Sequence, residues 1–390
     1  MKKLFVSILL VVFVVSGCTK QKDAGNVSDI TEYTGVALQT IDADETIPPE
    51  TETVSEPKYS KSIDIKGEVV GLDATENAIY TKNDGDAYSY VLSSGEFVEQ
   101  PMEKTTYTKA GLNDDVELYY SFSDGKLLAF SEDNINDSVY VADDSTIVII
   151  DEGRWDKYVY RINVSSGESV ELKFDFGTGR DETIVDIKIS PDHTKAVATL
   201  ESVEVDCIYY LLDFMTGKAV NLNEVYGVPV YQKNEDGILI DSNFDFADKD
   251  TIIAAVKSNG ETRIIKCDIN AQNAEILTTI ESEHTNIKAG KGYTVAVFDE
   301  TEAVLISNDD GGKTHMDVII GSWTDIVKKD DKWLAMSNKR INTTYMINLE
   351  TGEVSENSAE ENDLYTSFVS DSGELVEYEI DGNKILYGTD

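Results

Sequence analysis

Apolar and polar residues alternate with a period of two over most of the chain from residue 63 onward. The apolar positions form short runs rich in β-branched and aromatic residues, and Gly, Asp, Asn and Ser separate the runs. Period two is the spacing of one face of a β-strand, and no long stretch keeps the spacing of an amphipathic helix. The pattern therefore predicts an all-β domain over residues 63–390.

A recurrent unit in this domain consists of a strand, a tight turn that contains Gly, and a second strand. Four clear copies cover residues 88–100, 158–172, 209–222 and 344–356, with the turn glycines Gly95, Gly167, Gly217 and Gly352. Degenerate copies lie near Gln272 and Gly311. If six intervals separate Gly95 from Gly352, the period is about 43 residues, which is typical of propeller blades.

A second unit precedes some of these hairpins. The segments SFSDGKLLAF (121–130) and ISPDHTKAVATL (189–200) resemble the Ser-Pro-Asp-Gly-Lys turn of TolB-like, WD40-like and dipeptidyl-peptidase-like propeller repeats. The first copy lacks Pro and the second lacks Gly. Ser and Asp side chains can close such a turn by bonding to its backbone, and the following Ala suits a crowded position between blades. This resemblance implies a β-propeller.

A third motif, Asn308-Asp309-Asp310-Gly311-Gly312-Lys313-Thr314-His315, resembles the Asp-box hairpin of sialidase-type propellers. His315 stands where that family usually has Trp, and only one copy is visible. Asp boxes are structural features of the blade rim. The motif therefore supports the fold and implies no sialidase chemistry.

These patterns predict a single β-propeller over residues 63–390, with seven blades expected and six or eight left open. The C-terminal segment 364–388 offers about three strands, and the segment 62–72 could supply the fourth strand that closes the ring. Such pairing would protect the free strand edges. The main alternative is a two-sheet sandwich, for which this domain is long.

The N-terminus has the pattern of an export signal. Lys2 and Lys3 precede an apolar run from Leu4 to Val15, which is too short to span the roughly 30 Å of a bilayer core. The run ends in Val15-Ser16-Gly17-Cys18, which resembles the bacterial lipobox. The resemblance implies that residues 1–17 are a lipoprotein signal peptide and that Cys18 carries acyl chains such as palmitate. An ordinary secretory signal is the alternative.

Residues 18–62 have the composition of a disordered acidic linker. They hold three of the six prolines, are rich in Thr, Glu and Asp, and contain few apolar residues. Residues 19–62 carry a charge of about −5, while the whole chain of 390 residues carries −41, from 74 acidic and 33 basic side chains. Most of the negative charge therefore belongs to the predicted propeller, where we expect it to serve solubility.

This charge excludes partners that are recognised by their phosphates. Nucleic-acid binding depends on Lys and Arg, and the chain has five arginines: Arg154, Arg161, Arg180, Arg263 and Arg340. An anionic membrane surface would also repel the domain. The expected partners are the membrane, reached through the lipid on Cys18, and an unidentified envelope protein or glycan.

Catalytic signatures are weak. The three histidines, His193, His284 and His315, have no spacing typical of zinc ligands, and neither HExxH, CxxC nor GxSxG occurs. A sialidase would have to bind an anionic sugar with a strongly acidic domain. We expect Cys207 and Cys267 to be buried free thiols because they fall out of step in different repeats.

Two groups of residues are candidate ligand sites. Asp241, Asp245, Asp248 and Asp250 lie in one Asp-rich segment and could bind calcium, although their spacing is not that of an EF-hand loop and a solvated acidic turn is the simpler interpretation. Trp155, Trp323 and Trp333 could line a binding face or could pack between blades. No other cofactor is expected.

The sequence thus predicts a lipid-anchored propeller outside the cytoplasmic membrane that acts as a binding or scaffold protein without enzymatic activity. This interpretation rests on the signal, the architecture and the weak catalytic signatures, because propellers carry many unrelated functions. The alternative is an extracellular carbohydrate-active hydrolase with carboxylates at the centre of the ring.

Overall fold

The computed structural model describes most of the chain between residues 59 and 388. The described ranges are 59–73, 76–109, 115–123, 126–132, 137–151, 157–177, 183–202, 205–227, 243–258, 260–282, 285–298, 302–321, 324–357, 364, 367–370 and 372–388. All of them belong to the compact unit Glu56–Asp390. The predicted signal peptide, Cys18 and the linker up to residue 58 lie outside the described residues.

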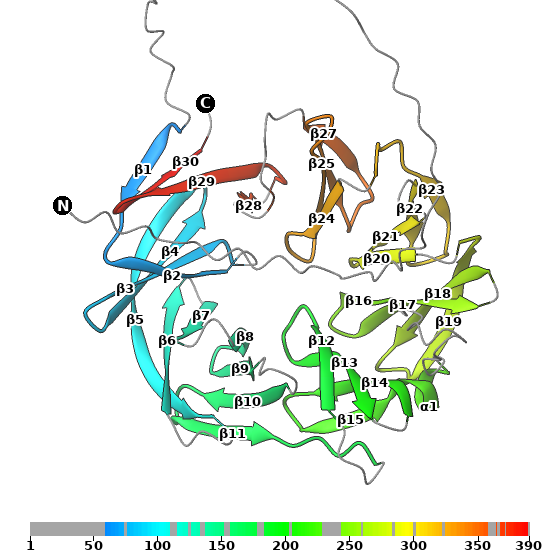
Figure 1. Cartoon of the computed structure of the whole chain (residues 1–390), viewed down its shortest axis with the longest axis horizontal. Helices are drawn as coiled ribbons and strands as arrows, with labels where there is room; N and C mark the ends of the chain where they lie inside the picture. The colour runs from blue at the N-terminus through cyan, green and yellow to red at the C-terminus, as the bar shows by residue number, and fades with distance from the viewer. Residues whose placement is uncertain are drawn as a thin grey trace, which may run out of the picture. The chain divides into compact units, whose positions relative to one another are not determined.

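The strands of the described residues form seven sheets arranged around a ring, which confirms the predicted all-β, seven-bladed propeller (Figure 1). Blade 1 contains β2 (Glu68–Asp73), β3 (Ala78–Asn83), β4 (Asp86–Ser93), β5 (Glu96–Thr108), β6 (Asp115–Ser123) and β7 (Lys126–Ser131). Blade 2 contains β8 (Asp137–Asp143), β9 (Thr146–Asp151), β10 (Tyr158–Asn163) and β11 (Glu168–Leu172). Blade 3 contains β12 (Thr183–Ile189), β13 (Lys195–Ser202), β14 (Val205–Asp213) and β15 (Lys218–Asn221), followed by the short helix α1 (Leu222–Tyr226).

The remaining blades follow in chain order. Blade 4 contains β16 (Asn243–Asp248), β17 (Thr251–Ser258), β18 (Glu261–Asp268) and β19 (Asn273–Ile280). Blade 5 contains β20 (Thr285–Ala289), β21 (Tyr293–Phe298), β22 (Glu302–Ser307) and β23 (Lys313–His315). Blade 6 contains β24 (Thr324–Lys328), β25 (Trp333–Asn338), β26 (Thr343–Asn348) and β27 (Val354–Asn357). Blade 7 contains β28 (Ser367–Val369), β29 (Leu375–Asp381), β30 (Lys384–Tyr387) and β1 (Lys61–Asp64).

Blade 1 departs from the four-stranded pattern because β5 belongs to two halves of one sheet. Its first half pairs with β4 and its second half pairs with β6, and Figure 1 shows it running along the outer side of both strands. The two halves pack face to face, with the ring of Tyr80 stacked on Phe130 at 5.1 Å. The interval between Gly95 and Gly167 is longer than the others because the second half of β5, together with β6 and β7, lies between these two turns.

The hydrophobic core lies between successive layers of the ring. Each cluster joins the facing sides of two neighbouring sheets, or of the two halves of blade 1; for example, Ile147 and Ile149 of β9 pack against Leu118 of β6. Ala196 and Ala198 of β13 are fully buried, in agreement with the small residues predicted for crowded positions. Burial of each large apolar side chain contributes roughly 1.5–3 kcal/mol.

The ring closes as the sequence predicts. β1 pairs antiparallel with β30, so an N-terminal strand completes the C-terminal blade. The side chain of Asn77 adds a second connection, since its Nδ2 donates to the carbonyl oxygen of Val369 at 3.0 Å and its Oδ1 accepts from the Val369 N–H at 3.3 Å. Blade 1 is thereby joined to both the inner and the outer strand of blade 7.

The predicted turns occupy their expected places. Gly95, Gly167, Gly217 and Gly352 all adopt positive φ angles between the third and fourth strands of a sheet, and the degenerate copy at Gln272 has a φ of 51°. Because neighbouring strands are antiparallel, these turns lie on the same side of the ring as the turns between first and second strands. We call this side the turn face and the opposite side, which carries the longer connections, the loop face.

The two motif turns are held by their own side chains. In the turn between β12 and β13, Ser190 donates to Asp192 at 2.8 Å and accepts from the Lys195 N–H at 2.9 Å. In the Asp-box hairpin of blade 5, Asp310 Oδ1 accepts from the Gly312 N–H at 3.0 Å, and the buried Asn308 donates to the Gly290 carbonyl oxygen of the β20–β21 turn at 2.6 Å. Both motifs therefore serve the fold.

Candidate functional site

Charged side chains from blades 3, 4 and 6 lie near the centre of the ring, on its inner strands. The edge of an innermost strand has no neighbour, so its backbone N–H and C=O groups need other partners. Lys188 of β12 donates to the carbonyl oxygen of Phe244 in β16 at 2.8 Å. Asp245 of β16 in turn accepts from the Ala289 N–H of β20 at 2.7 Å. Side chains thus satisfy the free edges of the inner strands.

Lys328 completes this central cluster, which we define as Lys188, Asp245 and Lys328. Lys328 extends from β24 in blade 6 to blade 4, where its Nζ lies 3.3 Å from the Phe246 carbonyl oxygen and 3.9 Å from Asp245 Oδ2. The side chains of Lys328 and Asp245 are each about four-fifths buried, at 20% and 19% exposure. Lys328 and Asp245 therefore form an ion pair that links blade 6 to blade 4, and neither side chain is open to solvent as a catalytic acid or base would be.

Two further groups lie near the central cluster on the turn face. The His193 Nδ1–H donates to the Val141 carbonyl oxygen at 2.8 Å, which joins blade 3 to blade 2 and sets the tautomer of the ring. Partial desolvation raises the pKa of Asp331, while the charges of Lys328 and His193 oppose that rise. The turn face at the centre of the ring therefore carries a mixed set of charges.

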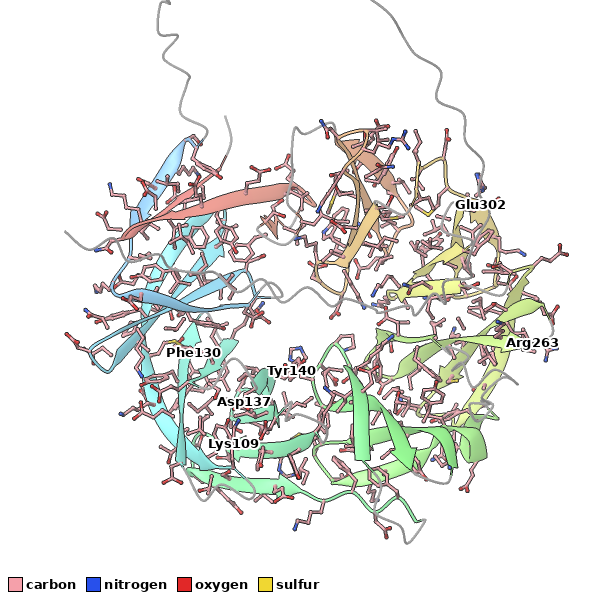
Figure 2. All side chains as sticks on the ribbon, viewed as in Figure 1. Lys109, Phe130, Asp137, Tyr140, Arg263 and Glu302 are labelled. Carbon is pink, nitrogen blue, oxygen red and sulfur yellow. The ribbon has the colours of Figure 1, made fainter. Side chains whose placement is uncertain are left out.

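A second polar group is buried where blade 1 meets blade 2, on the loop face. The Lys109 Nζ lies 2.6 Å from Asp137 Oδ1 and 3.4 Å from Asp151 Oδ1. Tyr107 and Ser131 donate hydroxyl hydrogen bonds to Asp137. Figure 2 shows Lys109 and Asp137 at this junction, with Tyr140 closer to the centre of the ring. One ammonium here faces two carboxylates.

This buried group, the Lys109–Asp137–Asp151 triad, carries an excess negative charge when all three side chains are ionised. The Asp137 side chain is completely buried. Burial, reinforced by repulsion from Asp151, raises the pKa of Asp137 to about 7. A carboxyl group of this kind gains or loses its proton near neutral pH, while Tyr107 and Ser131 keep it hydrogen-bonded.

The aspartates proposed for calcium have separate partners where the structure describes them. Asp245 belongs to the central cluster, Asp248 accepts from the Asp250 N–H at 2.8 Å, and Asp250 pairs with Lys195 at 3.4 Å. Asp241 lies outside the described residues. Within the described ranges, no group of three or more His, Cys, Asp or Glu side chains is arranged to hold a metal ion.

Trp333 packs between blades 6 and 7. It is partly buried and packs against the cluster that contains Val369, and its ring lies so close to Gly373 that a Cβ there would approach it to 2.4 Å. Trp155, Trp323 and Cys18 lie outside the described residues, as does His284. Cys267 is a buried free thiol, as predicted, and burial raises its pKa to about 12.

The sequence did not single out the central cluster or the Lys109–Asp137–Asp151 triad. A weak signal exists for the first, since Lys188 and Lys328 are charged residues in short strands that also contain Ile and Val. The triad has no such signal because its three members come from different blades or strands. No helix among the described residues is long and apolar enough to cross a membrane.

No protein-family model matches the chain, and no curated protein matches it in sequence. Among solved structures, the chain is similar to the computationally designed Ika8 protein, with 12% identity, a TM-score of 0.40, and coverage of 84% of this chain and 95% of that one. An oligogalacturonate lyase from Vibrio parahaemolyticus matches with 11% identity, a TM-score of 0.39, and coverage of 71% and 77%.

A third similar structure is a putative dipeptidyl aminopeptidase IV from Bacteroides ovatus. It has 11% identity and a TM-score of 0.42, and the match covers 78% of this chain and 55% of that one. The chain therefore spans about half the length of this aminopeptidase. These similarities concern the propeller fold alone.

Proposed function

We propose that the chain is a lipoprotein whose propeller is a non-enzymatic binding module on the outer side of the cytoplasmic membrane. In this proposal Cys18 carries the lipid, residues 19–58 form the tether, and the ring presents its faces to an envelope protein or glycan. The lipobox-like segment before Cys18 and the acidic composition of the tether support this arrangement.

The observation that carries the proposal is that the three charged side chains of the central cluster already have partners within the ring. Lys188, Asp245 and Lys328 bond to one another or to backbone groups of neighbouring blades. A hydrolase at the centre of the ring would need a carboxylate free to reach substrate, whereas Asp245 is held by the Ala289 N–H and Lys328. The central cluster stiffens the ring, and a stiff ring suits recognition by preformed surfaces.

The anchor is tested by metabolic labelling with a fatty-acid analogue. Cys18 is the proposed acylation site, so we expect Cys18→Ser to abolish the label and to remove the chain from the detergent-rich phase. The matched control is Cys267→Ala, which changes a buried thiol and should keep the label. Equal labelling of the Cys18→Ser variant would contradict the anchor.

The binding role is tested by crosslinking in living cells followed by mass spectrometry. We expect one or a few envelope proteins or glycans to be captured repeatedly by the native chain and less by the Cys18→Ser variant, which lacks the membrane address. Turnover of cell-wall glycans or chromogenic glycosides by the purified chain, lost in an Asp245→Asn variant, would show instead that the central carboxylate is catalytic.

A further inference from the structure

A cavity of about 250 Å³ opens between blades 2 and 3 on the turn face. Its wall on the blade 2 side consists of two cross-strand rows, one with Thr146, Asn163 and Glu168 and the other with Arg161 and Val170. Deeper rows of the same face, such as Ile150 and Val159, belong to the buried core. The apolar interface between the blades thus becomes polar where the cavity begins. We call it the Arg161 pocket; its residues are Thr146, Arg161, Asn163, Glu168, Val170 and Met215.

Arg161 is held in place from one side of its guanidinium. The Nη1 group donates to the carbonyl oxygens of Phe214 and Met215 in the turn after β14, at 3.3 Å to Phe214. That turn is itself fixed, because Asp213 accepts from the Met215 and Thr216 N–H groups at 2.9 Å. The Nε and Nη2 edge of Arg161 has no protein partner among the described residues. This edge is the fork that binds a carboxylate with two parallel hydrogen bonds.

The rest of the pocket adds three complementary features. Glu168 is exposed at the start of β11, and its carboxylate has no partner among the described side chains. The Asn163 Oδ1 accepts from the Ser166 N–H at 2.9 Å, which leaves its amide N–H₂ as a donor. Val170 and Met215 provide apolar surface and are each 37% exposed. A cation, an anion and apolar walls therefore surround a space smaller than the 300–1,000 Å³ typical of drug-sized sites.

We propose that the Arg161 pocket binds a zwitterionic amino-acid unit. The carboxylate lies on the Nε and Nη2 edge of Arg161, the ammonium points toward Glu168, and the aliphatic part contacts Val170 and Met215. A zwitterion also suits the molecule as a whole, since a net charge of −41 repels a purely anionic ligand at long range. The unit is either a free amino acid or the carboxyl-terminal lysine of a peptide, and both offer the same pair of charges.

This inference deepens the proposed binding function and rests on it. The test uses the purified full chain and titrates it with four probes by calorimetry or ligand-observed NMR. L-leucine has the charges of a free amino acid, Nα-acetyl-L-lysine has those of a carboxyl-terminal lysine, L-lysine has both, and L-lysinamide lacks the carboxylate. Saturable binding of L-leucine points to a free amino acid, and binding of Nα-acetyl-L-lysine points to a peptide end. In either case L-lysinamide should bind at least about tenfold more weakly than L-lysine, because the charge-assisted bidentate contact of the carboxylate is lost.

Variants identify the pocket. Arg161→Lys can still donate to the two carbonyl oxygens but loses the two parallel N–H donors, so it should weaken binding by about tenfold. Arg263→Lys, which changes an exposed side chain of β18, should leave binding unchanged. Glu168→Gln should weaken binding of the probe that carries the ammonium, and Glu171→Gln, on the other face of β11, is its control. Circular dichroism checks that each variant folds.

Two outcomes overturn the inference. The first is no saturable binding of any probe. The second is that the native chain binds L-lysinamide as tightly as L-lysine and that the Arg161→Lys variant binds L-lysine as tightly as the native chain. In both cases the labelling of Cys18 and the capture of envelope partners remain independent tests. A native chain that is acylated and captures partners, yet does not bind the probes, would keep the proposed function and remove the Arg161 pocket from it.

Discussion

Asp137 is the residue whose protonation the fold changes most clearly. Its carboxyl group is completely buried beside Lys109 and Asp151, and its pKa is raised to about 7 by burial and by repulsion from Asp151. The unfolded chain would ionise this group near its ordinary value of 3.8. Between these two values the folded state holds a proton that the unfolded state lacks. The stability that the buried, protonated Asp137 contributes is therefore fully present below pH 3.8 and is lost as the pH rises through 7.

The Asp137→Asn variant tests this linkage. An amide stays neutral at every pH and leaves Lys109 paired with Asp151, so the fall in unfolding free energy between pH 5 and pH 8 should shrink by about 2 kcal/mol. Urea denaturation at several pH values measures the slope. Asp143→Asn is the control, because the pKa of the exposed Asp143 is lowered by hydrogen bonds and does not titrate in this window. Equal slopes for the native chain and Asp137→Asn would contradict the assignment.

At the scale of single elements, the Asp-box hairpin of blade 5 shows how a turn joins neighbouring blades. Gly311 adopts a φ of +69° and lies against β19 of blade 4, where an added Cβ would come within 2.0 Å of the Leu277 carbonyl oxygen. Lys313 donates to the Thr279 carbonyl oxygen at 2.9 Å in the same strand. The hairpin covers part of the free edge of β19, which otherwise offers unpaired backbone groups.

The pair Gly311→Ala and Gly217→Ala separates backbone strain from this contact. Gly217 has a similar φ of +71° but open space around its Cα. We expect Gly217→Ala to cost about 1–2 kcal/mol of unfolding free energy, because only the left-handed backbone opposes the methyl group. Gly311→Ala should cost about 3 kcal/mol or more, since the hairpin must also move away from Leu277. Thermal and urea denaturation measure both variants, and equal losses would show that the contact with β19 is unimportant.

At the scale of the whole molecule, stability depends on closure of the ring. β1 covers the outer edge of β30, and Ile63 packs against the cluster shared by blades 1 and 7. Removing β1 exposes the edge of β30 and weakens the contact between the two ends of the ring, which then depends on the Asn77–Val369 hydrogen bonds and the remaining shared cluster. Blade 1 and blade 7 then lose the strand pairing that is one of their connections.

Two deletions measure how much closure of the ring by β1 adds to the stability of the propeller. Deletion of residues 20–58 removes most of the predicted linker 18–62 and should leave the melting temperature of the propeller nearly unchanged. Deletion of residues 20–64 removes β1 as well, and it should lower the melting temperature by several degrees and broaden the transition. Differential scanning calorimetry compares the two, and coincident transitions would show that the other interfaces alone hold the ring.

The net charge of the propeller is also a property of the whole molecule. Many like charges spread over one ring repel each other, and NaCl weakens this repulsion by shortening the Debye length from about 30 Å at 0.01 M to about 8 Å at 0.15 M. We therefore expect the melting temperature to rise over this range of NaCl. Calcium chloride at matched ionic strength should add a further rise only if the Asp-rich segment binds the ion, and a melting temperature indifferent to NaCl would remove the repulsion argument.

The local pattern of the sequence determined the strands, the hairpin turns and the closing strand. Period-two alternation, turn glycines such as Gly167 and Gly217, and the apolar C-terminal segment each act through neighbouring residues, so they can be interpreted without knowledge of the fold. The Ser190–Asp192 turn and the Asp box were predictable for the same reason, since their side chains bond to their own turns.

Contacts between blades were decided only by the tertiary structure. β5 spans both halves of blade 1 because Tyr80 and Phe130 stack across the bent sheet, and no local motif specifies that meeting. Lys109 meets Asp137 and Asp151, and Arg161 meets the turn of blade 3, through the closure of the ring rather than through sequence spacing. Local interactions define the strands, whereas the sites depend on which faces the strands bring together.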